Sequence, residues 1–240
     1  MLKAVILAGG LGKRLRPLTN DRPKPLVEVA GRPIVVWQVE WLRRQGVSTF
    51  IMCVGHLKEK FLEIVGNGSR LGVKVYYSVE EEPLGTGGAL KNAEPLLKGE
   101  DVFVVVNGDV LTNLDVSRLV EKARGAVGSI ALVPLPSPYG VVETDGEVAR
   151  SFVEKPLLRE YWINAGVYAF TPRVFEYLPE RGDIEREAFP RVAREGLLRA
   201  VKYDSVAWKS IDTHKDIEEA EKSVIPYLKA ASPHTSSSAP

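Results

Sequence analysis

The chain has 240 residues, of which 45% are hydrophobic and 26% are charged, as expected for one large globular domain or two small ones. Its 32 basic and 31 acidic residues nearly cancel, so no global field favours nucleic acid or an anionic membrane as partner. The single cysteine, Cys53, excludes an internal disulfide and lies in an apolar run, where we expect a packed thiol. The first residues lack the apolar run of a signal peptide, and no uncharged run could span a bilayer. We therefore expect a cytoplasmic protein.

The first half of the chain alternates between strand and helix patterns. In chain order, the expected elements are a strand at 3–7, a helix at 33–45, a strand at 49–54, a helix at 57–65, a strand at 73–78, a helix at 88–97 and a strand at 102–106. The strands are apolar on both faces. Such an alternation predicts an α/β three-layer sandwich, in which helices cover both faces of a mostly parallel sheet.

The second half is richer in β patterns. Asp145-Gly146 is a strong hairpin signal between strands expected at 140–144 and 148–154. The other expected elements are strands at 130–135 and 163–170, helices at 172–177 and 184–194, a strand pair at 200–204 and 207–211, and a last helix at about 215–229 that is kinked at Pro226. We expect an antiparallel extension that covers one side of the first half, and a disordered tail at 232–240.

The first strand leads into the glycine-rich stretch A-G-G-L-G-K-R-L-R-P. Glycines after a strand let the backbone approach a ligand closely, and crowded cations favour an anion between them. A dinucleotide fingerprint would need a third glycine where Leu15 stands. A P-loop would need glycine at Leu7 and a hydroxyl residue at Arg14. The stretch favours a phosphate site of another kind, and a tight turn with solvated cations is the alternative.

A second block, R-P-K-P-L, strengthens the phosphate interpretation. It brings Arg22 and Lys24 close in sequence to the cations of the glycine-rich stretch. Pro23 and Pro25 restrict the backbone on either side of Lys24, so this lysine is held by rigid neighbours. A fixed ammonium group suits a triphosphate better than a mobile surface lysine would.

These two blocks resemble the signature of the sugar nucleotidyltransferases, which join a nucleoside triphosphate to a sugar 1-phosphate. Later segments resemble the same family in the same order, from residue 2 to about residue 220: E-P-L-G-T-G-G-A-L, V-V-V-N-G-D, Y-G-V-V-E, F-V-E-K-P, I-N-A-G-V-Y and D-I-E-R-E-A-F-P. The resemblance implies a Rossmann-like catalytic domain over 1–230, with nucleotide-binding residues in about 1–112 and an antiparallel sugar-binding extension in about 113–230. Longer members continue into a left-handed β-helix, and we expect no such domain here.

The family's reaction is attack of a sugar phosphate oxygen on the α-phosphorus of the triphosphate, with pyrophosphate leaving in line. Both reactants are anions, so a hard divalent cation lowers the barrier, and Mg²⁺ is the implied cofactor. Asp109 follows a strand at the edge where α/β sheets bind ligands, and Asp212 matches the family's second metal ligand. Without the resemblance, a turn residue is the favoured interpretation of Asp109. For Asp212 the alternative is the N-cap of the last helix, and Thr213 is the other candidate for that cap.

Arg14 matches the family's arginine on the triphosphate, and Lys24 matches its lysine beside the α-phosphate. The resemblance therefore assigns Arg14, Lys24 and Asp109 to catalysis. It assigns nucleotide-side substrate contacts to Leu7, Ala8, Gly9, Gly10, Gly85, Thr86, Gly88 and Asn107. These are mostly backbone contacts, so no side chain among them identifies the base.

On the sugar side, Glu154 and Lys155 match a pair in which glutamate accepts sugar hydroxyl groups and lysine binds the sugar phosphate. An ordinary surface ion pair is the alternative for both. Gly140 and Asn164 match positions that line the sugar pocket. The three histidines have no clustered partner and are given no role.

The later motifs are most similar to those of mannose-1-phosphate guanylyltransferases, which implies GTP and mannose 1-phosphate as substrates. UTP or dTTP with glucose 1-phosphate is the alternative pair of substrates. A homodimer is a possible oligomeric state. A non-catalytic regulatory subunit could lose Arg14, Lys24, Asp109 or Asp212, and all four are present. A glycosyltransferase on a related nucleotide-binding sheet is a further alternative, but it would usually have an Asp-x-Asp metal motif where this chain has Asn107-Gly108-Asp109.

Overall fold

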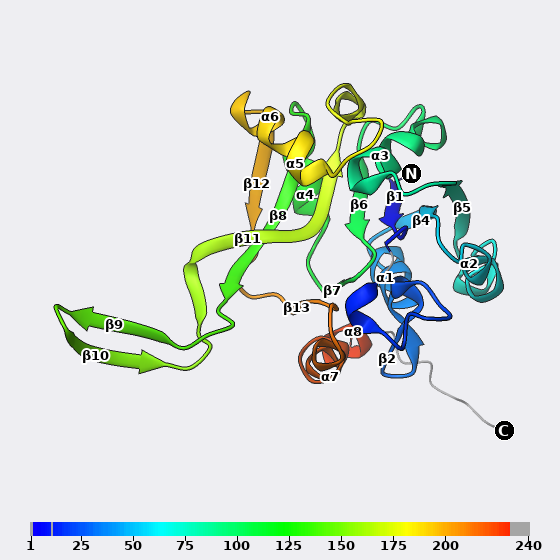
Figure 1. Cartoon of the computed structure of the whole chain (residues 1–240). Helices are drawn as coiled ribbons and strands as arrows, with labels where there is room; N and C mark the ends of the chain where they lie inside the picture. The colour runs from blue at the N-terminus through cyan, green and yellow to red at the C-terminus, as the bar shows by residue number, and fades with distance from the viewer. Residues whose placement is uncertain (1, 11, 231–240) are drawn as a thin grey trace.

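Seven strands form the central sheet in the computed structural model, which describes residues 2–10 and 12–230 (Figure 1). Their order across the sheet is β12-β8-β11-β6-β1-β4-β5. The strands are β1 (Leu2–Leu7), β4 (Val47–Val54), β5 (Lys74–Val79), β6 (Phe103–Asn107), β8 (Gly128–Pro136), β11 (Leu157–Phe170) and β12 (Leu198–Lys202). The tail expected at 232–240 lies outside the described residues.

Four of the six strand pairs in this sheet are parallel, because only β11 runs against its two neighbours, β8 and β6. The predicted mixed, mostly parallel sheet is therefore confirmed. Strands from both halves of the chain belong to it: β6 lies between β1 from the first half and β11 from the second. The carboxyl ends of β1 and β6 consequently lie side by side, with Leu7 opposite Asn107.

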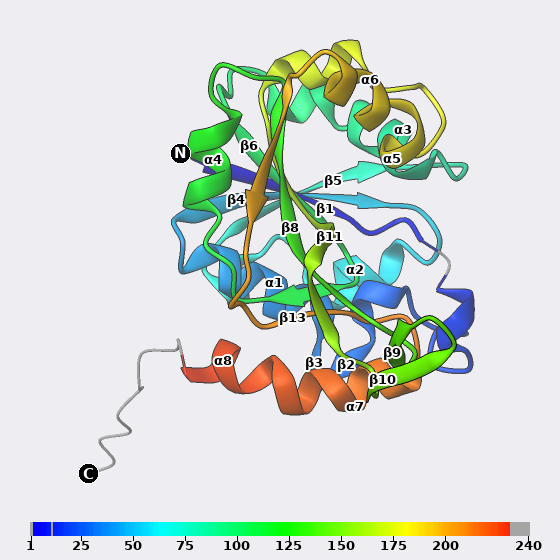
Figure 2. The same ribbon diagram turned by 90° about the vertical axis from the view of Figure 1, so that its left-hand side faces the viewer.

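Helices cover both faces of the sheet (Figure 2). The α-helices are α1 (Ile34–Arg43), α2 (Glu59–Ile64), α3 (Gly85–Asn92), α4 (Ser117–Ala123), α5 (Ile184–Glu187), α6 (Phe189–Arg194), α7 (His214–Ser223) and α8 (Ile225–Ala230). The short 3-10 helices are η1 (Lys13–Leu15), η2 (Lys24–Leu26), η3 (Ser69–Leu71), η4 (Glu94–Leu97) and η5 (Pro172–Glu176). Among the described residues, no helix has the length and apolar character needed to cross a membrane.

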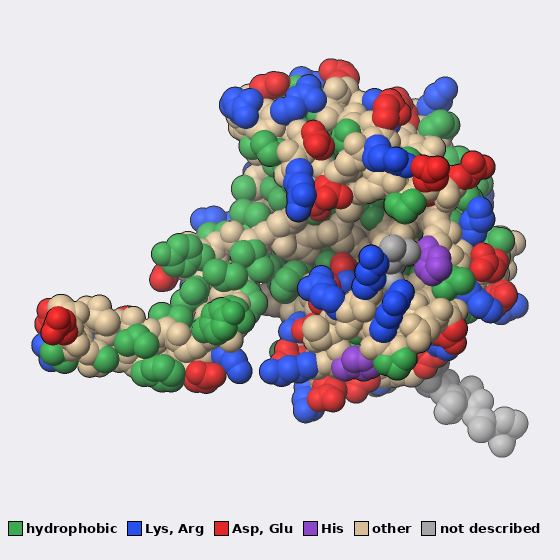
Figure 3. All heavy atoms as spheres, in the orientation of Figure 1, with side chains coloured by type: hydrophobic (Ala, Val, Ile, Leu, Met, Phe, Trp, Pro, Cys, Tyr) green, Lys and Arg blue, Asp and Glu red, His purple; other side chains and the backbone are tan. Residues whose placement is uncertain are grey.

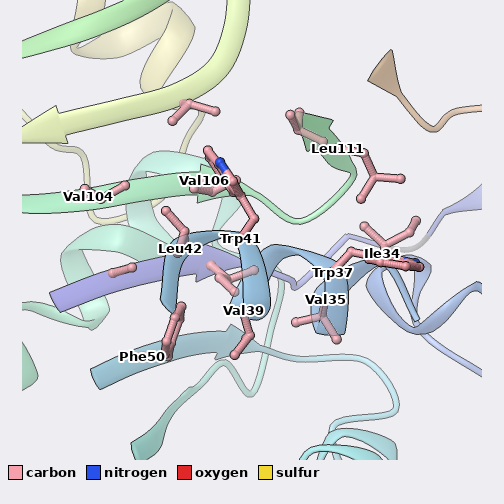
Figure 4. Close-up of a cluster of buried hydrophobic side chains, with 14 of the residues drawn as sticks. Ile34, Val35, Trp37, Val39, Trp41, Leu42, Phe50, Val104, Val106 and Leu111 are labelled. Carbon is pink, nitrogen blue, oxygen red and sulfur yellow. The ribbon is translucent and has the colours of Figure 1, made fainter. Parts of the chain in front are cut away.

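Alternation along the central strands divides the core into two layers. Ala4 and Ile6 of β1 pack into the layer that contains α1, α4, α7 and α8, whereas Val5 packs into the layer of α3, α5 and α6. In the first layer, α1 presents buried Trp37 and Trp41 to the sheet (Figure 4), and their indole N–H groups donate to the carbonyls of Val29 and Leu114 at 2.9 and 3.1 Å. These hydrogen bonds tie α1 to the segments around Val29 and Leu114, which follow β1 and β7 in the chain.

Two predicted helices are interrupted near a proline. The helix expected at 88–97 is α3 followed by η4, which contains Pro95, and the helix expected at 184–194 is divided into α5 and α6 just before Pro190. Proline has no N–H to continue the helical hydrogen-bond pattern and crowds the preceding turn. The last predicted helix is likewise divided, into α7 and α8 at Val224.

The strands expected at 200–204 and 207–211 do not pair with each other, which corrects the prediction of a strand pair. β12 is parallel to β8 at the edge of the main sheet, and β13 (Trp208–Ser210) is antiparallel to β7 (Val110–Thr112). β7 directly follows Asp109, and Ile211 donates its N–H to the Asp109 carbonyl at 2.9 Å. This small β7–β13 sheet therefore brings the segment of Asp212 to the edge of the main sheet.

The expected hairpin is present as β9 (Val141–Asp145) and β10 (Val148–Val153), but it projects from the body (Figures 1 and 3). The prediction that the antiparallel part covers one side of the first half is therefore wrong. β8 and β11 extend the main sheet edgewise, and the hairpin continues beyond them. Apolar side chains along the hairpin are exposed, with Phe152 at 68%.

Candidate active site

A cavity of about 320 Å³ lies at the carboxyl ends of β1 and β6, a size at the lower end of small-molecule pockets. It is lined by eight residues that the sequence assigned to the site: Leu7, Gly9, Gly10, Lys24, Gly85, Thr86, Asn107 and Asp109. The other lining residues are Pro25, Glu80, Pro83, Ala89, Gly108 and Asp183. Figure 3 shows Lys and Arg side chains gathered beside this region, over the loop that follows β1.

Lys24 lies between two aspartates that are far apart in the sequence. Its Nζ donates to Asp109 Oδ2 at 2.6 Å and to Asp212 Oδ1 at 2.7 Å, and its side chain is only 13% exposed. Lys24 opens η2 directly after Pro23. One cation thus contacts both aspartates that the sequence assigned to a metal.

Asp212 is available for this contact because another residue caps α7. Thr213 accepts the N–H of Asp216, and the Asp216 carboxylate accepts the N–H of Thr213 at 2.7 Å, which is a capping box. The rival assignment of the cap is thereby settled in favour of Thr213. Asp212 instead accepts from Arg14 at 2.8 Å as well as from Lys24.

The pair Asp109 and Asp212 fits one divalent cation. Both carboxylates already converge on a single ammonium group, and carboxylate oxygens are the donors that hard cations prefer. Within residues 2–10 and 12–230, no group of three or more His, Cys, Asp or Glu side chains forms a complete metal site. Two carboxylates leave most positions of such an ion to phosphate oxygens and water, as in many phosphoryl-transfer enzymes.

Two glycines of the pocket lie at close approaches, and at Gly85 the approach is to backbone, so glycine is required there. A Cβ on Gly9 would lie 2.7 Å from Glu80 Oε1. Gly85 has φ +75°, and a Cβ there would lie 2.5 Å from the carbonyl oxygen of Gly182. The second contact joins the start of α3 to the loop before α5, where Gly182 also accepts the N–H of Gly87 at 2.9 Å.

A chain of hydrogen bonds runs from the pocket to Asn164 on β11. Thr86 donates to Glu185 at 2.8 Å, Tyr168 donates to the same carboxylate at 3.4 Å, and Asn164 donates to the Tyr168 hydroxyl at 2.8 Å. Sequence reasoning noted the motif that contains Glu185 but gave this residue no role. The chain connects one expected nucleotide-side residue with one expected sugar-side residue.

The remaining assigned residues lie outside the pocket lining. Ala8 is buried, and Gly88 faces inward in α3, where a Cβ would lie 2.5 Å from the carbonyl of Glu180. Glu154 and Lys155 form an ion pair at 3.5 Å at the end of β10, and Gly140 lies beside Glu154 on the same hairpin. The structure therefore does not bring the hairpin residues next to Asp109.

Glu80 is a pocket residue that sequence reasoning missed. It begins the run E-E-E-P, which resembles a solvated charge cluster, yet it is only 7% exposed. A signal was present, since alternation from the buried Ser78 of β5 places Glu80 on the inward face. Burial raises the pKa of the Glu80 carboxyl above its usual value, and the hydrogen bond from the Leu84 N–H opposes this shift.

The raised pKa predicts how stability depends on pH. The folded protein binds a proton at Glu80 more readily than the unfolded chain does, so this group adds stability as the pH falls from 7 toward the usual carboxyl value of about 4.5. The melting temperature of the wild type should therefore rise relative to that of Glu80→Gln over this range. Cys53 does not titrate there, because burial and the Glu80 charge raise the pKa of its thiol. A constant difference between the two melting temperatures would contradict the assignment.

Comparison with known proteins places this geometry in a family. The family model described as nucleotidyl transferase matches residues 3–225. The chain belongs to the nucleotidyl transferase family. The motif segments that resemble this family in the sequence lie within the matched residues.

Relatives within this family are similar over most of this nucleotidyl transferase chain. The mannose-1-phosphate guanylyltransferase catalytic subunit beta of Xenopus tropicalis is 40% identical over 225 residues, which cover 90% of this chain and 62% of the relative. The mannose-1-phosphate guanyltransferase of Candida albicans is 38% identical over 228 residues, with the same coverage. The chain thus spans about 62% of the length of these relatives.

Solved structures agree with the fold of this nucleotidyl transferase. The crystal structure of HddC from Yersinia pseudotuberculosis complexed with GMP-PN has a TM-score of 0.73 and 30% sequence identity. The similarity covers 92% of this chain and 99% of that chain. The Rossmann-like α/β fold expected from the sequence is confirmed.

Proposed function

We propose that the protein is a mannose-1-phosphate guanylyltransferase, which converts GTP and mannose 1-phosphate to GDP-mannose and pyrophosphate. The observation that carries the proposal is the Lys24 ammonium between Asp109 and Asp212, beside a glycine-lined pocket at the carboxyl edge of the sheet. Family membership and the guanylyltransferase relatives support the choice of reaction and of substrates.

In this reaction a phosphate oxygen of mannose 1-phosphate forms a bond to the α-phosphorus of GTP. The bond from the α-phosphorus to the bridging oxygen breaks, and pyrophosphate leaves with the electron pair. The attacking oxygen is already ionised, so no separate general base is needed. Lys24 would neutralise charge at the α-phosphate, and Arg14 would hold the leaving phosphates; their ion pairs with the two aspartates support these roles.

Asp109 and Asp212 are the residues that would hold the divalent cation, which we propose to be Mg²⁺. Bound there, the ion would supply charge neutralisation for the triphosphate and the leaving pyrophosphate. The exchange of an ammonium contact for a metal contact keeps both carboxylates paired with a cation.

The sugar side of the proposal rests on Gly140, Glu154, Lys155 and Asn164. Asn164 supports it through the hydrogen-bond chain to Thr86. Lys155 and Glu154 lie at the junction of β10 and β11, where both side chains are accessible to a ligand, at 54% and 62% exposure. We assign nucleotide binding to about residues 1–112 and sugar phosphate binding to about residues 113–230.

A grid of turnover assays tests the substrates. Pyrophosphate release is measured with each of GTP, UTP, dTTP and ATP against mannose 1-phosphate and glucose 1-phosphate. The proposal expects the highest kcat/KM for GTP with mannose 1-phosphate. A higher value for UTP or dTTP with glucose 1-phosphate would replace this substrate pair, and no release with any pair would remove the enzyme assignment.

Lys155→Ala tests the sugar side. The loss of a charge-assisted hydrogen bond of about 1.5–3 kcal/mol should raise KM for mannose 1-phosphate by roughly ten- to a hundredfold, with the KM for GTP little changed. A smaller loss of kcat is expected because a loosely held nucleophile is aligned less often. Arg150→Ala is the matched control, since Arg150 is an exposed cation on the same hairpin that pairs with Asp145. Weaker GTP binding with unchanged sugar phosphate affinity would place Lys155 elsewhere.

A further inference from the structure

The helix α1 carries one buried amide among apolar side chains. Gln38 is only 1% exposed and lies between Trp37 and Val39, which are both buried. Among the described residues, its Oε1 is one of three buried side-chain atoms without a hydrogen-bond partner. A buried polar atom without a partner is costly, so a glutamine at this position requires an explanation. The explanation lies in what its two N–H groups hold.

These N–H groups hold the turn that carries Asp109. Gln38 Nε2 donates to the carbonyl of Asn107 at 2.9 Å and to the carbonyl of Val110 at 2.8 Å. Asn107 is the last residue of β6 and Val110 is the first residue of β7, so Asp109 lies between the two carbonyls. A primary amide has two N–H groups on one nitrogen, which matches two converging acceptors. Gln38 therefore joins both ends of the turn to α1.

Other backbone groups of the turn are fixed by neighbouring strands. The N–H of Gly108 donates to the carbonyl of Leu7 at 2.9 Å, and the N–H of Ile211 donates to the carbonyl of Asp109 at 2.9 Å. A Cβ on Gly108 would lie 2.6 Å from the Leu7 carbonyl oxygen, so the turn packs directly on the end of β1. These contacts hold the turn against β1 and the segment after β13, whereas Gln38 holds it against α1.

We propose that Gln38 is a positioning residue, which holds the Asp109 carboxylate where it meets Lys24 and the divalent cation. Asp109 contacts Lys24 at 2.6 Å, and the contact of its carbonyl with Ile211 transmits a displacement of the turn to the segment of Asp212. Without the amide, two backbone carbonyls lose their donor, and the turn has to open or admit water to satisfy them. Both carboxylates would then shift relative to the cation.

This inference rests on the proposed function, in which Asp109 holds the cation. Gln38 does not line the cavity, so it acts through Asp109 and not on a ligand. Groups that orient metal ligands from outside typically change metal affinity or activity by about ten- to a hundredfold when they are removed. The expected signature is therefore a loss of kcat and of metal affinity, with binding of GTP little changed.

Gln38→Met tests the proposal, since methionine is unbranched, has nearly the length of glutamine and removes both donors. We expect kcat for pyrophosphate release to fall by about ten- to a hundredfold, with the KM for GTP little changed. A second measurement needs no turnover. Mn²⁺ binding to the complex of the full chain with GTP is followed by electron paramagnetic resonance of the free ion, without sugar phosphate. The Mn²⁺ affinity of the variant should be weaker by about tenfold or more.

Gln45→Met is the matched control, because it makes the same change just after α1. Gln45 Nε2 donates to the carbonyl of Leu114 at 3.2 Å, and its Oε1 accepts the N–H of Val116 at 2.8 Å. This variant therefore also loses two hydrogen bonds to the backbone, in a segment that does not carry Asp109. Its melting temperature should fall, as that of Gln38→Met should, while its kcat and Mn²⁺ affinity stay near the wild-type values.

A double variant separates positioning from a general loss of stability. If Gln38 acts through Asp109, Gln38→Met should slow Asp109→Asn only slightly, because the carboxylate that it positions is already lost. Gln38→Asn serves if the methionine variant does not fold. Its amide is one methylene shorter and cannot hold both carbonyls, so its kcat and Mn²⁺ affinity should lie between those of the wild type and those expected for Gln38→Met.

Three outcomes would overturn the proposal: equal losses of kcat in the two glutamine-to-methionine variants, a wild-type Mn²⁺ affinity in Gln38→Met, or fully additive losses in the double variant. Wild-type kcat and Mn²⁺ affinity in Gln38→Asn would overturn it as well. Failure of the proposed function appears separately, as no turnover by the folded wild type with any substrate pair. The Mn²⁺ affinities of Gln38→Met and Gln45→Met would then decide the present inference alone.

Discussion

Asp109→Asn is expected to lower kcat for pyrophosphate release by about a hundredfold or more. Asp109 and Asp212 share one cation in the structure, at 2.6 and 2.7 Å from Lys24 Nζ, and both would hold the divalent ion during the reaction. The loss of one carboxylate misplaces the charge that stabilises the transition state. Asp212→Asn should have an effect of similar size. Steady-state rates at saturating Mg²⁺ and substrates measure both.

The double variant gives a sharper result than either single one. Residues that act as a unit are strongly non-additive, so Asp109→Asn with Asp212→Asn should be about as slow as the slower single variant. Asp101→Asn is the matched control, since Asp101 is exposed just before β6 while Asp109 follows the other end of the same strand. Near-normal turnover in either single variant would remove that aspartate from the metal site.

Lys24→Ala is the second change with a large expected effect. Lys24 is the first residue of η2, between Pro23 and Pro25, and in the proposed mechanism it acts on charge that changes at the α-phosphorus. Its removal should therefore lower kcat by about a hundredfold or more, while KM for GTP changes much less. Single-turnover rates together with GTP binding by calorimetry separate the two effects.

The same variant should bind Mg²⁺ more tightly in the absence of nucleotide. The Lys24 ammonium contacts both Asp109 and Asp212, so without it the two carboxylates repel each other and only the Arg14 contact to Asp212 still competes with the ion. Lys98→Ala, at an exposed lysine far along the chain, serves as the control. A raised KM for GTP at unchanged kcat would show that Lys24 contributes only to ground-state binding.

The sequence predicted the elements whose patterns are local. The strands β1, β4 and β6 are apolar runs bounded by turn signals, and the helix α1 ends near Gly46 as expected. Strand pairing was harder to predict from the sequence, because β12 pairs with β8 and β13 pairs with β7, and both partners are remote in the chain. The direction of the β9–β10 hairpin could not follow from its turn residues, since these fix its register but not where it points.

The residues of the candidate site could be predicted only where they belong to a motif that resembles the family's. Lys24, Asp109 and Asp212 converge over sequence separations of 85 and 188 residues, and spacing alone gives no reason for such a meeting. Glu80 shows the opposite failure. Its acidic neighbours made it look solvated, although the strand alternation before it placed it in the pocket wall.

The central claim is that this chain transfers a guanylyl group to mannose 1-phosphate through the Lys24, Asp109 and Asp212 cluster. The most direct measurement is ³¹P NMR of the full chain mixed with GTP, mannose 1-phosphate and Mg²⁺. We expect signals of GDP-mannose and pyrophosphate to appear together, to be abolished by EDTA, and to be absent on the same timescale in Asp109→Asn. Formation of GDP and inorganic phosphate instead, or of no product by the folded wild type, would contradict the account.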